Sequence, residues 1–231
     1  MAMTVELPDP KRHGALRMGE ALAAYIPSFV QIVAGEVAAA VALCPVMLTK
    51  HPDTGAFYMA ALLGLKPDEP ALVTREELSA SFRPLDLERR GFYLTDDGLA
   101  IDQNDPRFAD QAAEPLFAAD GAPGAALQRM SAIVQTLHVE LQQTDAFIAS
   151  ILAMKLVQPI DISLNFDDGE KLTLAGLYTI SLDALADLED DQVLSLFRTG
   201  HLQIAHALAG SIRQFPRLAQ RRNARLALPV R

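Results

Sequence analysis

Two neighbouring arginines in the middle of the chain, Arg89 and Arg90, offer the binding chemistry on which we place most weight. Two adjacent guanidiniums can hold a carboxylate or a phosphate through paired N–H donors. The structural alternative is that one arginine caps the end of a short helix while the other pairs with Asp86 or Glu88. We expect at least one guanidinium to face a carboxylate, from the chain itself or from a bound acidic group such as a peptide terminus.

The histidines do not have the spacing of a metal site. A metal ion needs His, Cys or carboxylate ligands that converge on one point. His201 and His206 are five residues apart, so on one helix they point about 140° away from each other. We therefore expect no bound metal and no cofactor. His206 lies on an apolar helix face, where we interpret it as a hydrogen-bonded core histidine.

Nucleophilic chemistry has two weak candidates, Cys44 and Ser211. The flanking glycines of a GxSxG elbow are missing at Ser211, and the chain contains neither a GxGxxG motif nor a P-loop. Cys44 lies between apolar runs without a basic neighbour, so we expect an unreactive core residue. His206 and Ser211 on one helix are the thin basis of an enzyme alternative, either a hydrolase or an accessory subunit of an iron-dependent oxygenase. We lean against catalysis and assign no catalytic residue.

Composition limits the partners and the compartment. The 231 residues include 29 acidic and 20 basic side chains, a net charge of −9, which argues against a nucleic-acid partner. The apolar stretch 37–48 is about 12 residues long and contains Pro45, whereas a membrane span needs roughly 20 residues. The N-terminal residues lack the basic start and apolar run of a secretory signal. We therefore expect a cytoplasmic protein without a membrane span.

The elements that position these residues have clear sequence signals. Alternating apolar residues predict strands at 29–33, 44–48, 56–65, 91–95, 99–102, 160–166 and 171–180, several of them paired as hairpins by Asp-Gly or Pro-Asp turns. Helical spacing predicts one long helix over 125–156, with Leu137 and Leu141 as core residues on its apolar stripe, and a C-terminal helical segment over 201–222. Shorter helices are expected at 15–25, 36–43, 75–79, 85–90 and 191–198, and Ser181 is expected to cap another.

We therefore predict an α+β fold, in which mixed small antiparallel sheets (hairpins) pack with the long central helix and the C-terminal helical segment. A single domain is expected over 1–231, with a loose N-terminal arm at 1–14 and a basic tail at 226–231. Four C-terminal arginines recur at roughly helical spacing: Arg217, Arg221, Arg222 and Arg225. They could offset the acidic stretch 183–191 in the same molecule or in a neighbour, so we allow for a homo-oligomer.

The order of motifs over roughly residues 20–225 resembles the SapC family. In the C-terminal half the matching residues are 168–171, 176–178, Leu182, Leu185, Gly200, Leu202, 205–208, Ser211 and Leu218. Upstream, the matching residues are 44–46, 61–65, Arg89, Arg90, Phe92, 114–117 and 120–121. Two tyrosines of the family pattern are replaced, one by Cys44 and the other by Gly91.

This resemblance implies a non-catalytic binding or assembly protein that acts with a peptide or protein partner. Family members are often found beside outer-membrane receptors, flavin-dependent halogenases and cupin-like oxygenases, which implies a bacterial surface, uptake or peptide-modification system. A structural surface-layer component is a further alternative. The residues that we expect to contact a ligand or partner are Arg89, Arg90, Phe92, His206 and Ser211.

Overall fold

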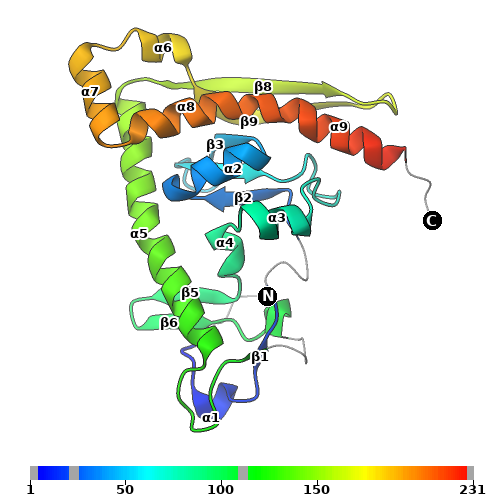
Figure 1. Ribbon diagram of the computed structural model, residues 1–231, viewed down its shortest axis with the longest axis vertical. Coiled ribbons are helices and arrows are strands. Elements are labelled where there is room, and N and C mark those ends of the chain that lie inside the picture. Colours follow the sequence, from blue (N-terminus) through cyan, green and yellow to red (C-terminus); the bar gives the residue numbers. More distant parts are fainter. Residues whose placement is uncertain (1–4, 21–25, 109–113, 228–231) are drawn as a thin grey trace. The chain divides into compact units, whose positions relative to one another are not determined.

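The computed structural model describes residues 5–20, 26–108 and 114–227, and its contacts divide the chain into two compact units. Unit 1 consists of Met1–Tyr25 and Arg83–Glu140, and unit 2 of Ile26–Phe82 and Leu141–Arg231. Figure 1 labels the elements of both units. Antiparallel sheets and helices occur in each, which confirms the predicted α+β class. The long helix α5 (Ala125–Ala153) contributes its first part to unit 1 and its last part to unit 2.

Unit 2 is built on a five-stranded antiparallel sheet with the strand order β2-β4-β3-β9-β8. The strands are β2 (Phe29–Ile32), β3 (Val46–Lys50), β4 (Phe57–Leu62), β8 (Val157–Asn165) and β9 (Lys171–Ile180). Both predicted hairpins of this sheet are present, β3 with β4 and β8 with β9. Gly55 and Gly169 turn these hairpins at positive φ, a conformation that glycine adopts without a steric penalty.

Helices complete unit 2, and α8 is the one that touches the sheet most closely. The helices are α2 (Val37–Leu43), α3 (Arg75–Ser81), α6 (Leu182–Ala186), α7 (Asp190–Arg198), α8 (His201–Ser211) and α9 (Phe215–Leu226). In Figure 1, α8 and α9 run along the β8–β9 hairpin. The predicted helix over 201–222 is interrupted by a 3-10 turn at Ile212–Gln214, because Pro216 has no N–H to continue the helical ladder.

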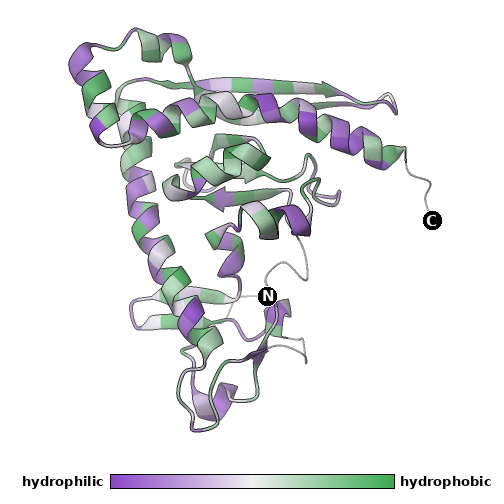
Figure 2. Ribbon diagram, viewed as in Figure 1, coloured by the Kyte–Doolittle hydropathy of each residue, from purple (hydrophilic) through white to green (hydrophobic). Residues whose placement is uncertain are grey.

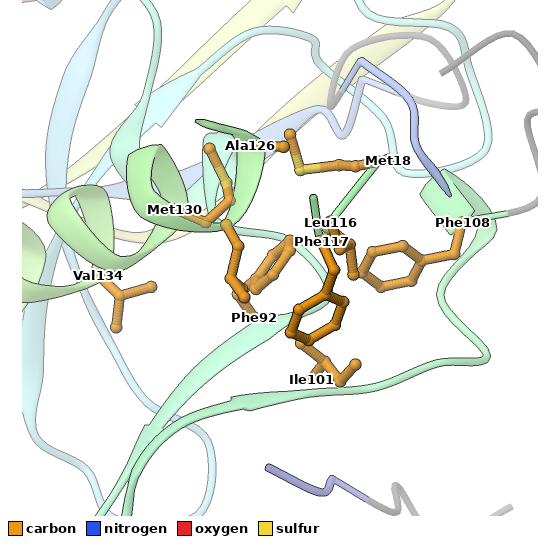
Figure 3. Packing of buried hydrophobic residues seen from close by; sticks show 10 residues of the cluster. Met18, Phe92, Ile101, Phe108, Leu116, Phe117, Ala126, Met130 and Val134 are labelled. Atoms are coloured by element: carbon orange, nitrogen blue, oxygen red, sulfur yellow. The ribbon is translucent and has the colours of Figure 1, made fainter. Parts of the chain in front are cut away.

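Unit 1 has two small antiparallel pairs around an aromatic core. β5 (Phe92–Thr95) pairs with β6 (Gly98–Ile101), as predicted, and β1 (Arg17–Met18) pairs with β7 (Glu114–Pro115). The helices α1 (Pro10–His13) and α4 (Leu85–Glu88) and the 3-10 turn η2 (Pro106–Phe108) join them. Figure 3 shows the core, in which side chains of α5 such as Met130 face Phe92, Phe117 and Ile101.

Three local expectations were wrong. Of the loose arm expected at 1–14, residues 1–4 lie outside the described residues, and 5–14 are not loose, because Asp9 caps α1 through its side chain and Glu6 pairs with Ile101. The helix expected at 15–25 is replaced by β1 at its start, and its end at 21–25 lies outside the described residues. In α5, Leu137 is buried as expected, whereas Leu141 is only half-buried.

Candidate functional site

Arg89 lies at the end of α4 and is held by its own chain. Its Nε and Nη2 atoms both donate to Oδ1 of Asp86, and Nη1 donates to the carbonyl oxygen of Phe92. The guanidinium carbon lies 5.4 Å from the centroid of the Tyr93 ring. The carboxylate that we expected an arginine to face is therefore Asp86 of the same chain, as in the structural alternative given above. This arrangement gives Arg89 a defined orientation at a partly exposed position.

A buried arginine that the sequence did not single out, Arg107, shapes the same helix end. Its side chain donates from Nη1 to the carbonyl oxygens of Glu88 and Arg90, at 2.7 and 2.9 Å, and from Nε to that of Gly19. Carbonyls at a helix C-terminus have no helical partner, so this guanidinium satisfies two of them. Burial lowers the pKa of Arg107. No local pattern signals the role of Arg107, because its partners lie 17 to 88 residues away.

Phe92 is part of the core of unit 1 and not of its surface. The side chain is fully buried, and its ring centroid lies 5.5 Å from that of Phe108. Between Arg90 and Phe92 the chain turns at Gly91, which has a φ of +80° and is packed against Phe108 and Asp105. Phe92 therefore has no exposed area to offer a partner, and its ring centroid lies 5.5 Å from the guanidinium carbon of the buried Arg107.

Ser211 and His206 lie on α8 but are not brought together. Ser211 is 2% exposed, accepts a hydrogen bond from the N–H of Val46 and donates to carbonyl oxygens of Val46 and Leu208. The strand β9 pairs with β3 at Leu48, two residues further on. The Ser211 hydroxyl thus provides hydrogen-bond partners for the N–H and the carbonyl of Val46 at the start of β3. His206 is exposed, which corrects the expected core histidine. His206 and Ser211 are five residues apart, so they lie on different sides of α8, one exposed and the other buried.

Cys44 is a buried core residue, as expected. It has no exposed area, and burial raises the pKa of its thiol to about 12. The thiolate is the nucleophilic form of cysteine, so this side chain is not activated for attack at neutral pH. Neither Cys44 nor Ser211 is therefore set up as a nucleophile.

The C-terminal arginines are engaged by acids and carbonyls of unit 2, and not by the acidic stretch 183–191. Arg222 is 4% exposed and pairs with Glu69, Asp168 and Glu170. Arg221 donates both terminal nitrogens to Glu77 at 2.7 Å, and Arg225 donates to the carbonyl oxygens of Pro70 and Ala71. Arg217 contacts Gln214. The helical spacing of these arginines was predictable from the sequence. Their partners were not, because those acids and carbonyls are distant in sequence.

The acidic stretch itself forms an exposed surface on α6 and α7. We define the acidic–apolar surface by these residues: Leu182, Asp183, Asp187, Glu189, Asp190, Asp191, Leu194 and Phe197. All of them are exposed, and Phe197 is the extreme, at 69%. In the part of the chain that the structure describes, none of the five carboxylates forms an ion pair within 4.0 Å. Figure 2 shows hydrophobic and hydrophilic residues side by side on α7.

Residues 5–20, 26–108 and 114–227 contain no group of three or more His, Cys, Asp or Glu side chains that could hold a metal ion. In those same ranges, no helix combines the length and the apolar character that crossing a bilayer requires.

Comparison with known proteins identifies the family of the chain. The family model described as SapC matches residues 9–218, and the chain belongs to the SapC family. The match runs through both units. No curated protein and no solved structure matches the chain.

Proposed function

We propose that this SapC-family protein is a non-catalytic binding or assembly protein that acts with a peptide or protein partner. The observation that carries the proposal is Phe197, a large aromatic side chain that is 69% exposed on α7. Exposed apolar groups that lie close together on a protein surface are typical of interaction sites. Aromatic side chains in particular supply much of the energy of protein interfaces.

The exposure of Phe197 is not the result of a loosely held helix. The N-terminus of α7 is closed by a capping box between Glu189 and Gln192, and Leu196 anchors the opposite face with no exposed area. At the other end the hydroxyl of Thr199 donates to carbonyl oxygens of the last turn. Gly200, at a φ of 78°, then starts α8. The helix therefore presents Phe197 in a defined direction.

Arg89, Arg90 and His206 remain proposed contacts, supported by exposed or partly exposed side chains. Phe92 and Ser211 enter this proposal only as supports, because both are buried. The bacterial surface, uptake or peptide-modification setting and the cytoplasmic location are also proposals, and they rest on the family resemblance and on sequence features.

The experiment is affinity purification of the tagged full-length protein from its native host, with quantitative mass spectrometry and a tag-only control. We expect the same partner in near-stoichiometric amount in every replicate. Metal analysis of the purified protein runs beside it, since stoichiometric iron or zinc would favour the enzyme alternative. Recovery of the protein alone in all replicates would contradict the proposed function.

A further inference from the structure

We propose that the acidic–apolar surface of α6 and α7 binds an amphipathic segment of the partner that carries lysine or arginine side chains beside apolar ones. This inference rests on the proposed function and adds the location of the contact and the chemistry of the partner. It follows from two independent properties of the surface, its exposed apolar groups and its unpaired charge.

The apolar part consists of side chains that the fold itself does not use. Leu194 and Phe197 are three residues apart on α7, so they lie on the same face one turn from each other. They are 45% and 69% exposed, while Leu196 between them is fully buried. Leu182 on the preceding helix α6 is 52% exposed. Three of the eight large hydrophobic residues that are notably exposed in the described chain thus fall within sixteen consecutive positions.

The charged part determines which partner can cover these groups. Residues 182–198 contain five carboxylates and one basic residue, Arg198, a balance of 1 − 5 = −4. Of the four C-terminal arginines, Arg221, Arg222 and Arg225 are engaged with Glu77, Glu69 and the 70–71 carbonyls, and Arg217 contacts Gln214. An acidic partner would be repelled, whereas a basic one gains attraction and faster encounter.

A segment with both properties is an amphipathic helix or an extended peptide whose apolar side chains cover Leu194 and Phe197. Helices of this kind bind apolar surfaces through anchors spaced at three and four residues. Lysine or arginine at the rim would then reach Asp187, Asp190 and Asp191. A second copy of this chain is the competing occupant, since Arg213, in the 3-10 turn Ile212–Gln214, and Arg217, on α9, are both exposed.

The test uses the full-length protein and two synthetic helical peptides with the same leucine stripe, one with lysine and one with glutamate at all other positions. Binding is followed by fluorescence anisotropy at low and at high salt. The apolar variant is Leu194→Ala with Phe197→Ala, and the charge variant is Asp187→Asn with Asp191→Asn. Leu94→Ala in unit 1 is the matched control, because Leu94 is 44% exposed outside the surface.

We expect the lysine peptide to bind at least about ten-fold more tightly than the glutamate peptide, and the apolar variant to lose about ten-fold in affinity. The charge variant should lose much of the salt dependence, while Leu94→Ala stays within about two-fold of wild type. Equal binding of both peptides, or equal losses in the apolar variant and the control, would overturn the inference. Concentration-dependent self-association that the apolar variant abolishes would also overturn it, in favour of a second copy.

The failure of this inference is distinguishable from the failure of the proposed function. If the native partner still co-purifies with the Leu194→Ala, Phe197→Ala protein in wild-type amount, the partner binds elsewhere and only the surface assignment is wrong. If wild type recovers no partner at all, the proposed function itself is wrong.

Discussion

The guanidinium carbon of Arg222, on α9, lies 4.2 Å from the centroid of the Phe166 ring, which follows β8. Around this stack, the same guanidinium pairs with Glu69, Asp168 and Glu170, and Lys66 pairs with Glu69 and Glu170. Three segments far apart in sequence therefore meet at one buried side chain. A buried cation with this many partners is costly to remove, because its carboxylates would be left facing one another.

Replacement of Arg222 should destabilise unit 2 more than replacement of its exposed neighbour. For Arg222→Met we expect a loss of about 2–4 kcal/mol in the free energy of unfolding, below the upper end for a fully buried pair since the carboxylates are partly exposed. Arg217→Met, on the exposed face of the same helix, should change it by less than about 0.5 kcal/mol. Urea titrations of both variants measure the difference, and similar values would refute the proposed role of the network.

The same network predicts a loss of stability in acid. Hydrogen bonding to Arg222 lowers the pKa of Glu69 from 4.5 to about 2, and hydrogen bonding to Lys66 lowers that of Glu170. Because both carboxyls bind protons more weakly in the folded chain, the stability they add is complete above about pH 4.5 and is lost as the pH falls toward 2. Urea titrations between pH 7 and pH 3 should show a weaker pH dependence for Glu69→Gln than for wild type. Asp161→Asn, an exposed carboxylate of β8, is the control.

Ser211 should prove to be a structural residue. Ser211→Ala leaves the N–H and carbonyl of Val46 without their side-chain partner, so we expect a loss of about 1–3 kcal/mol in unfolding free energy. The exposed Ser195→Ala should have little effect. Partner recovery from the native host should be unchanged for folded Ser211→Ala protein. Wild-type stability combined with loss of the partner would instead make Ser211 a contact residue.

Arg107 should stabilise the C-terminal end of α4 in unit 1. Arg107→Met removes the donors to the Glu88 and Arg90 carbonyls, and we expect a loss of roughly 3 kcal/mol because bonds to a charged donor are strong. Hydrogen exchange should accelerate over residues 85–92. Arg129→Met breaks an exposed ion pair with Glu114 and should cost less than about 1 kcal/mol. No change in exchange over 85–92 in Arg107→Met would contradict this role.

The elements with a strong local pattern were predictable from the sequence. The alternation of Ile160, Ile162 and Leu164 against polar neighbours gave β8, and the apolar steps of α5 gave a helix of 29 residues. The Asp-Gly turn at 168–169 and the Ser181 cap are likewise local signals, which the structure bears out. Local backbone preference and side-chain periodicity suffice for such elements.

What could not be predicted depends on contacts that are distant in sequence. Arginine is mostly exposed in proteins, and no short motif signals that Arg107 and Arg222 are buried by partners distant in sequence. His206 falls on an apolar stretch of α8, but the face that the helix turns inward is set by Ala205, Leu208 and Ser211. The acidic stretch was visible in the sequence, whereas the exposure of Phe197 within it was not.

Photo-crosslinking from α7 in the native host tests the central claim most directly. A benzophenone amino acid is incorporated in place of Phe197, and in a second strain in place of Leu94, and the adducts are sequenced. We predict a reproducible adduct at position 197 only, with a partner segment that is apolar and carries a net positive charge. Equal adducts at both positions, or an adduct at 197 formed only with another copy of this chain, would contradict the account.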